Sequence, residues 1–237
     1  MKKVLIILPT YNEATNIEKI INKIIKLGCE VLVVDDNSPD KTFEIVENLK
    51  NQYKNINLIK RSGKLGLGSA YREGFRWALE NNFLFIVEMD ADFSHSLEDL
   101  EKMLSYRSKH DVIIGSRYTP EGKIEGWSKK RYYLSLIANK VVRLLAFTKV
   151  NELTGGFRIY TADALKKIDA INTKNNGYAF QIEMTINSII KGLSIKEVPI
   201  TFRERSGGIS KMNKFIIFEA IFYLMKIPFI RFFGIFR

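Results

Sequence analysis

Two carboxylates one residue apart, Asp90 and Asp92, end the apolar run Phe83–Glu88 and are followed by Phe93-Ser94-His95. Such a run predicts a buried strand, so the pair falls where that strand meets a loop. Carboxylates at the C-terminal edge of a parallel sheet lie where these folds bind ligands. A hard cation such as Mg²⁺ uses one or two carboxylates together with substrate phosphates. The pair therefore predicts a metal and diphosphate site.

An aromatic and polar motif, Pro9–Glu13, follows the first apolar run of the chain. Here Tyr11 could cover a nucleobase or ribose, and Glu13 could accept hydrogen bonds from either one. A simpler interpretation is that Asn12 or Thr10 caps the helix that follows. Both interpretations can hold together.

Two further motifs follow the second and third apolar runs. Asp35 and Asp36 lie where dinucleotide-binding folds carry a ribose-binding acid, and Asp40 is suited to cap a helix. The Gly-x-Gly-x-x-Gly motif of those folds is missing after the first run, so a Rossmann dehydrogenase is disfavoured. Lys64–Gly68 could let a ligand approach the backbone closely, but it lacks the Gly-Lys-Ser/Thr ending of a P-loop.

A sheet must hold these motifs in place. Short runs rich in Val, Ile and Leu predict buried strands, and the isoleucine stripe from Ile17 to Ile25 predicts a helix. The strands expected are Val4–Leu8, Glu30–Asp35, Ile56–Lys60, Phe83–Glu88 and Asp111–Gly115, and the further helices are Lys41–Tyr53, Gly68–Glu80 and Leu97–Arg107. Their alternation predicts an α/β fold with a mostly parallel central sheet flanked by helices.

The alternation becomes less regular in the second half of the chain. Tyr118–Ser128, with Pro120, Gly122 and Gly126, predicts a mobile loop. The later elements expected are a helix over Arg131–Phe147, a short strand over Thr154–Tyr160, a helix over Tyr178–Ile190 and a strand over Ser194–Arg203.

The chain has 237 residues and a net charge of +11, concentrated in two segments. Residues 117–150 hold eight Lys or Arg against two Glu, and residues 213–237 hold four against one. Basic stretches bind nucleic acid or anionic membranes, but no zinc-finger, RRM-like or basic-zipper pattern is present. Because the second segment is rich in aromatic residues, we expect an anionic membrane surface as the partner, and no nucleic acid.

The single cysteine, Cys29, excludes an internal disulfide and fits a reducing compartment. The apolar start Val4–Leu8 is too short for a signal peptide. Residues 213–237 are apolar but are interrupted by Glu219 and Lys226, whereas a spanning helix needs roughly 20 mainly apolar residues. We expect an amphipathic helix in the membrane interface; a helix packed on the core and a transmembrane span are the alternatives.

Taken in order, the motifs resemble the family-2 glycosyltransferases of the GT-A fold. The segments that carry this likeness are Pro9–Glu13, Val33–Asp40, Leu65–Gly68 and Met89–His95. Later segments resemble, within that family, the polyprenol-phosphate (dolichol-phosphate) mannose synthases: Gly115–Tyr118, Gly126-Trp127, Arg131, Leu153–Arg158, Gly177–Gln181, Glu197–Ile200 and Arg205 to Ser210-Lys211. The likeness covers about residues 4–211.

The resemblance implies a GT-A catalytic domain over residues 1–212, with residues 213–237 as a membrane-interface tail. Its reaction would move mannose from GDP-mannose to a polyprenyl or dolichyl phosphate, with Mg²⁺ or Mn²⁺ as cofactor. The enzyme would lie peripherally at the cytoplasmic face of a membrane. A separate membrane-anchoring subunit stays open.

The resemblance also assigns residues, with Asp92, Arg117 and Arg131 as the catalytic set. The donor nucleotide would be held by Pro9, Tyr11, Glu13, Val34, Asp36, Asp90, Ala91 and Asp92. The metal would bind Asp90 and Asp92; some relatives have Gln where this chain has Ser94, which could be a weaker contact. Donor and acceptor phosphates would meet Arg117, Arg131, Arg205 and Lys211, the last two on a lid that closes over them.

The proposed acceptor agrees with the residues present. Transfer to an alcohol needs a general base, and no base motif stands out in the sequence. A phosphomonoester is already anionic near pH 7 and needs cations instead. A metal and several arginines would reduce its repulsion from the donor diphosphate. Direct attack on the anomeric carbon predicts inversion.

Other interpretations stay open at this point. The donor could be UDP-glucose or another UDP-sugar, and the chain could be a sugar nucleotidyltransferase or a non-catalytic subunit that binds lipid or partners. Arg131 and Arg143 could form a solvated helix face, and Arg158 could pair with a carboxylate. Glu183 could bind sugar hydroxyls or support a buried network. Because the chain has only two histidines, His95 is expected to be structural.

Overall fold

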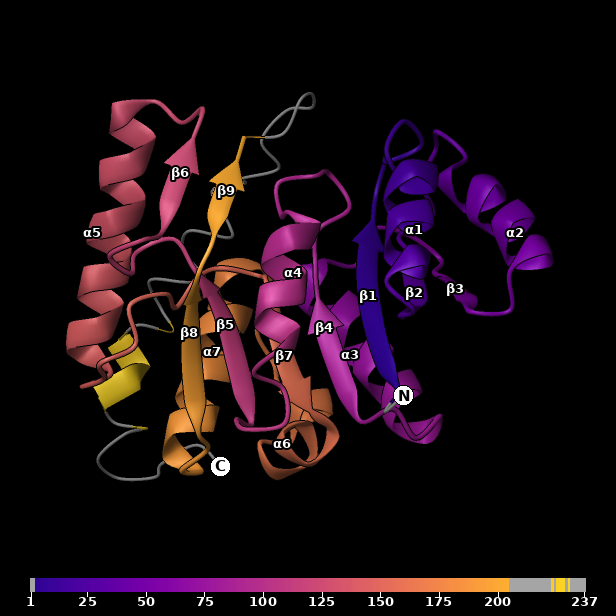
Figure 1. The fold of residues 1–237 in the computed structure, drawn as a ribbon. Helices are drawn as coiled ribbons and strands as arrows, with labels where there is room; N and C mark the ends of the chain where they lie inside the picture. Colours follow the sequence, from indigo (N-terminus) through magenta and orange to yellow (C-terminus); the bar gives the residue numbers. More distant parts are fainter. Residues whose placement is uncertain (1–2, 205–222, 224, 229, 231–237) are drawn as a thin grey trace.

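The first half of the chain alternates strands and helices as its sequence predicts (Figure 1). The computed structural model describes residues 3–204, 223, 225–228 and 230. Its first elements are β1 (Val4–Thr10), α1 (Ile17–Lys26), β2 (Glu30–Asp35), α2 (Thr42–Gln52), β3 (Ile56–Lys60), α3 (Leu67–Glu80), β4 (Phe85–Glu88) and α4 (Leu97–Leu104). The five strands and four helices expected up to residue 115 are all confirmed, with small shifts at their ends.

The remaining elements complete a central sheet and add a small second one. They are β5 (Val112–Ser116), β6 (Lys123–Glu125), α5 (Lys129–Leu145), β7 (Arg158–Thr161), α6 (Ala162–Lys167), the 3₁₀ turn η1 (Ala170–Asn172), α7 (Gly177–Ile190), β8 (Ile195–Pro199) and β9 (Thr201–Arg203). The central sheet has the order β3-β2-β1-β4-β7-β5-β8, and β6 pairs with β9. In the central sheet only β7 is antiparallel to its neighbours, which confirms the predicted α/β class.

β1 shows why the central strands read as continuous apolar runs. Leu5 and Ile7 belong to one hydrophobic core, and Ile6 and Leu8 belong to another. Successive side chains of a strand point to opposite faces, and both faces of this sheet are covered by helices. In Figure 1, α1 and α4 lie in front of the sheet and α3 and α7 lie behind it. Because helices cover both faces of the sheet, a ligand site is expected in the loops at the carboxyl ends of the strands.

One expectation for the second half of the chain is wrong, and two expected strands differ from the structure in their bounds. The predicted loop Tyr118–Ser128 contains β6, which pairs in parallel with β9. The predicted late strand Ser194–Arg203 is two strands in different sheets, because Ile200 bonds to Ser116 on one side and to Lys123 on the other. The predicted strand Thr154–Tyr160 begins only at Arg158, because side chains take the backbone N–H groups before it.

Little of the predicted tail belongs to the described part of the chain. Arg205, Lys211 and the predicted lid lie outside the described residues. Tyr223 and Ile227 are buried in the same core as α3 and α7. For these two residues the structure agrees with the alternative of a helix packed on the core, whereas Met225 is exposed. Within the described residues, no helix has both the length and the apolar character that a bilayer crossing requires.

Candidate active site

The residues predicted to hold a nucleoside lie together at the carboxyl ends of β1 and β2. Pro9 and Val34 are neighbours in the parallel ladder, and the N–H of Asp36 donates to the carbonyl of Thr10 over 3.0 Å. The ammonium of Lys64 lies 4.3 Å from the centre of the Tyr11 ring. The edge therefore offers an aromatic face, a cation and a carboxylate, which are suited to a base and ribose.

Asp36 is held by an arginine that the sequence did not single out. Arg61, at the end of β3, forms an ion pair with Asp36 over 2.5 Å and donates to the hydroxyl of Ser69 on α3. Its Nε also lies 3.1 Å from Glu73. Burial raises the pKa of Asp36 above its ordinary value, although the charge of Arg61 opposes that shift. The position of the carboxylate is thus fixed by β3 and α3.

The neighbouring acids and polar groups shape the loops. Asp35 accepts hydrogen bonds from the hydroxyls of Thr10 (2.7 Å) and Ser38 (2.6 Å) and is fully buried. The capping role considered for Thr10 and for Asn12 is wrong, since α1 begins after Asn16 without a side-chain cap. The N-cap of α2 is Lys41 and not Asp40 as expected, although Asp40 accepts the first N–H of the helix, at Thr42, over 3.1 Å.

Hydrogen bonds between side chains and backbone N–H groups within the loop hold the acidic loop after β4 in shape. Asp92 Oδ1 accepts the N–H of Ser94 over 3.0 Å, and Nδ1 of His95 accepts the N–H of Asp90 over 3.2 Å. Burial lowers the pKa of His95 to about 4, so the imidazole is neutral near pH 7, and the hydrogen bond from Asp90 to Nδ1 leaves its one proton on Nε2. The geometry agrees with the structural role expected for His95.

Aromatic rings connect this acidic loop to the predicted phosphate-binding arginines. His95 stacks on Phe157 at 4.5 Å and meets Phe202 edge-on at 5.6 Å. The guanidinium of Arg117 lies 5.4 Å from the Phe202 ring and 5.4 Å from Trp127. The β6–β9 pair supplies this bridge, since Phe202 is on β9. The acids and Arg117 therefore face the same edge of the sheet, although 25 residues separate Asp92 from Arg117 in the sequence.

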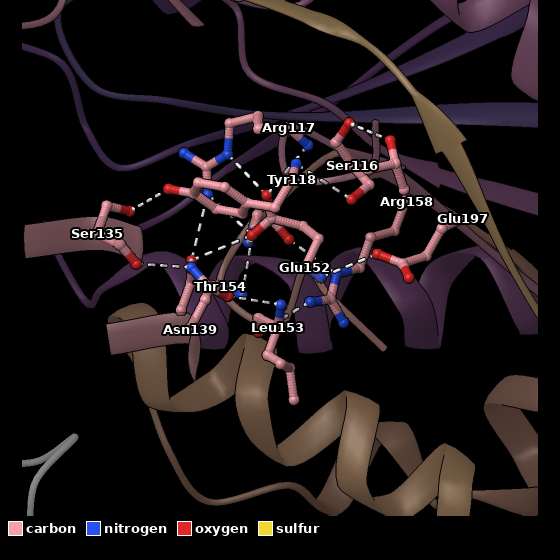
Figure 2. Close-up of polar contacts among 12 residues, drawn as sticks. Ser116, Arg117, Tyr118, Ser135, Asn139, Glu152, Leu153, Thr154, Arg158 and Glu197 are labelled. Atoms are coloured by element: carbon pink, nitrogen blue, oxygen red, sulfur yellow. Dashed lines mark hydrogen bonds and ion pairs between the residues drawn. The ribbon is translucent and has the colours of Figure 1, made fainter. Parts of the chain in front are cut away.

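Arg117 and Arg131 are held in two different ways. Arg117, after β5, forms two hydrogen bonds to Glu152 (2.7 and 2.9 Å), and the two side chains are 9% and 0% exposed. Figure 2 shows this pair with Thr154 beside both residues. Arg131, on α5, pairs with Glu204 over 2.6 Å at 41% and 42% exposure, and it lies 4.1 Å from the Trp127 ring. Exposed pairs contribute about 0–1 kcal/mol, so Arg131 can exchange partners easily.

Two other sequence alternatives are settled by contacts. Arg158 forms no ion pair within the described residues; it donates to the carbonyls of Leu153 (3.0 Å) and Gly155 (2.8 Å), so the predicted carboxylate partner is wrong. Glu183 accepts the N–H of Asn175 over 3.0 Å, which supports the alternative that it holds a polar network before α7.

A buried acid, Glu88, lies at the end of β4 just before the acidic loop. Its Oε2 accepts from Gln181 Nε2 over 2.8 Å. Among the described residues, its Oε1 and the Gln181 Oε1 have no hydrogen-bond partner. Burial raises the pKa of Glu88 to about 7, although Arg158 opposes the shift. A protonated carboxyl suits this environment better than a carboxylate.

The free energy of unfolding should depend on pH because the pKa of the buried Glu88 is raised. Between the ordinary pKa of 4.5 and about 7, the unfolded chain loses the Glu88 proton while the native chain keeps it. Stability should therefore fall by about 3 kcal/mol as pH rises through that window. Glu88→Gln cannot ionise, so its advantage over wild type in urea unfolding should grow by about that amount between pH 4.5 and 8. Parallel pH curves for the two proteins would contradict a raised pKa.

Comparison with known proteins places this chain in a family. Residues 5–169 match Glycosyl transferase family 2. A polyprenol monophosphomannose synthase of Mycolicibacterium smegmatis is 40% identical over 226 residues, which cover 93% of this chain and 85% of the relative. An undecaprenyl-phosphate mannosyltransferase of Micrococcus luteus is 39% identical over 221 residues, with 92% and 91% covered.

Solved structures share the fold at low sequence identity. Glucosyl-3-phosphoglycerate synthase of Mycobacterium tuberculosis, in complex with Mn²⁺ and UDP-glucose, gives a TM-score of 0.69 at 16% identity, covering 94% of this chain and 80% of that one. A mannosyltransferase of Pyrobaculum calidifontis, in complex with GDP-Man and Mn²⁺, gives 0.56 at 16% identity, covering 86% and 57%. These solved structures and the sheet order show that the chain has a GT-A-like fold. The chain belongs to glycosyl transferase family 2.

Proposed function

We propose that this protein transfers mannose from GDP-mannose to a polyprenyl phosphate, with inversion at the anomeric carbon. The two relatives at about 40% identity are named for polyprenyl-phosphate mannose chemistry. The observation that carries the proposal is the aromatic bridge through Phe202, which puts the Asp92 loop and Arg117 at one edge. A site for a donor diphosphate and a site for a second phosphate are then neighbours.

The donor set of the acidic loop fits a hard divalent cation. Asp90 and Asp92 are partly exposed, and the buried hydroxyl of Ser94 has no hydrogen-bond partner among the described residues. Within the described residues, no group of three or more His, Cys, Asp or Glu could hold a metal ion by itself. Donor phosphates would therefore complete the coordination, as they do for Mg²⁺. A bound Mg²⁺ or Mn²⁺ would act as a Lewis acid that stabilises the leaving nucleoside diphosphate.

The protein's own residues would then bring an anionic acceptor to the donor. Arg117 and Arg131, which both lie close to the Trp127 ring, would attract the lipid phosphate and offset its repulsion from the diphosphate. Arg131 would exchange Glu204 for the phosphate. A phosphate oxygen would attack the anomeric carbon directly, and no general base is needed since that oxygen is already anionic. Arg205 and Lys211 would add charge to the same site.

The identity of the donor is tested with purified protein, Mg²⁺ or Mn²⁺, polyprenyl phosphate and a panel of labelled sugar nucleotides. We expect label in the lipid from GDP-mannose and little from UDP-glucose. Label from UDP-glucose alone would replace mannose in this proposal by glucose. Absence of labelled lipid with every donor would refute polyprenyl-phosphate glycosyl transfer.

We further propose that α5 docks on an anionic membrane. An apolar stripe runs along its exposed side: Leu134, Ile137, Val141 and Leu144. A shallow hollow of about 470 Å³ continues this stripe and is lined by Lys140, Arg143, Leu144, Phe147, Thr148 and Lys149. In Figure 1, α5 lies at the margin of the molecule beside β6. Apolar side chains flanked by cations are typical of helices in a membrane interface. This site would hold the enzyme peripherally at the cytoplasmic face.

The α5 surface makes a quantitative prediction. Exchanging Leu134 and Leu144 for glutamate should lower partitioning onto anionic vesicles by tenfold or more, since one buried leucine contributes about 1.5 kcal/mol. Leu84→Glu changes an equally apolar exposed residue, before β4 on another part of the surface, and should bind vesicles like wild type. Unchanged binding of the α5 variant in a sedimentation assay would remove α5 from the membrane contact.

A further inference from the structure

Glu152 forms the centre of a buried polar network beneath Arg117. Its carboxylate accepts hydrogen bonds from Arg117 Nε (2.7 Å) and NH2 (2.9 Å). It also accepts the N–H of Gly155 over 2.9 Å and that of Thr154 over 3.2 Å. A Cβ at Gly155 would lie only 3.0 Å from the carboxyl carbon of Glu152. The backbone of residues 152–155 therefore wraps closely around this one carboxylate.

A second layer of contacts fixes this wrapped segment to the rest of the fold. Glu197 on β8 accepts the N–H of Glu152 over 2.9 Å, and Asn139 on α5 accepts the N–H of Leu153 over 2.9 Å. The guanidinium of Arg158 on β7 donates hydrogen bonds to the carbonyls of Leu153 and Gly155. Figure 2 shows these residues surrounding Glu152. Its position is determined by β8, α5 and β7 together.

The electrostatics keep Glu152 ionised despite full burial. Burial by itself would raise the pKa of Glu152, but the charge of Arg117 and its hydrogen bonds lower the pKa below its ordinary value. A buried ion pair of this kind rarely adds net stability compared with apolar residues of similar size. What a two-point carboxylate–guanidinium contact does supply is orientation, because the arginine fork is planar and rigid.

We infer that Glu152 is the positioning residue for Arg117 in the transfer of mannose to the acceptor phosphate. It holds the guanidinium plane at the end of β5, while the rings of Trp127 and Phe202 lie 5.4 Å from the guanidinium carbon. Arg117 thus meets the acceptor phosphate already oriented and without losing Glu152, whereas Arg131 must first leave Glu204. This inference rests on the proposed role of Arg117 in binding a phosphate.

The test is a double-mutant cycle between Glu152→Asp and Arg117→Lys. Aspartate keeps the charge but withdraws the carboxylate by about 1 Å, and a misplacement of that size can cost about a hundredfold. We expect kcat/KM for polyprenyl phosphate to fall by about ten- to a hundredfold in the wild-type background, with donor affinity unchanged. In the Arg117→Lys background the same change should cost less than about twofold, because the group that Glu152 orients is already lost.

Thr154→Val is a milder second variant should Glu152→Asp impair folding. It removes the hydroxyl that Arg117 NH2 contacts at 3.2 Å and should show the same dependence on Arg117 with a smaller loss. Glu125→Gln is the control: Glu125 forms an exposed ion pair with Arg203, and this variant should transfer mannose like wild type. Equal losses in both backgrounds would overturn the role of Glu152. Full transfer by Arg117→Lys alone would instead refute the role of Arg117, and no transfer by wild type would refute the proposed function.

Discussion

Replacing Asp92 by alanine should lower kcat/KM for lipid mannosylation by about a thousandfold, the scale of losing a principal electrostatic stabiliser of the transition state. Asp92 is partly exposed, and its side chain accepts a local hydrogen bond from the N–H of Ser94. Because this hydrogen bond stays within the loop, the unfolding temperature should change little. The loss would be measured as label transferred to polyprenyl phosphate at saturating Mg²⁺ or Mn²⁺.

Asp92→Asn separates the charge of this residue from the shape of its loop. Asparagine keeps an oxygen that can accept the Ser94 N–H but lacks the negative charge that a cation requires. We expect a loss as large as that of the alanine variant. Glu98→Gln, an exposed acid at the start of α4, is the matched control and should retain full activity. Near-normal turnover by Asp92→Asn would refute the metal and diphosphate role of this acid.

Removing Arg117 should destabilise the protein more than any single change at the exposed arginines. Arg117→Ala leaves Glu152 charged and fully buried, and breaking a buried ion pair from one side costs about 3–5 kcal/mol. The free energy of unfolding, measured by urea denaturation at pH 7, should fall by that amount. Lowering the pH should recover part of it, because protonation removes the uncompensated charge of Glu152.

Arg131→Ala provides the matched comparison, because it breaks an arginine–glutamate pair that differs chiefly in exposure. Arg131 and Glu204 are each about two-fifths exposed, and exposed pairs contribute about 0–1 kcal/mol. The variant should therefore unfold close to wild type. If both arginine variants lost the same stability, burial would not be what distinguishes the two pairs.

The strand and helix order was predictable from the sequence because it depends on local periodicity. β1 to β4 and their helices follow from apolar runs and isoleucine spacing, and they place Asp36 and Asp90 at one edge. The loop around Glu152 was not predictable in the same way. The sequence predicts a strand from Thr154 onward, and the residue that organises this loop, Arg117, lies 35 residues before Glu152.

The same limit explains the residues that sequence reasoning missed. Arg61 reaches Asp36 across 25 residues, and Phe202 meets His95 only because β9 leaves the main sheet to pair with β6. Patterns along one chain report which face of an element is apolar. They do not report which distant side chains a face will meet. A basic residue directly after β3 was the one available signal for Arg61.

In the proposed function, an anionic phosphate takes the place of an activated hydroxyl as the acceptor. The most direct test compares polyprenyl phosphate with unphosphorylated polyprenol of the same length, using labelled GDP-mannose, divalent metal and the purified wild-type protein. The site predicts labelled lipid from the phosphate alone, with the anomeric configuration inverted. Equal labelling of the free alcohol, or labelling of neither lipid, would contradict it.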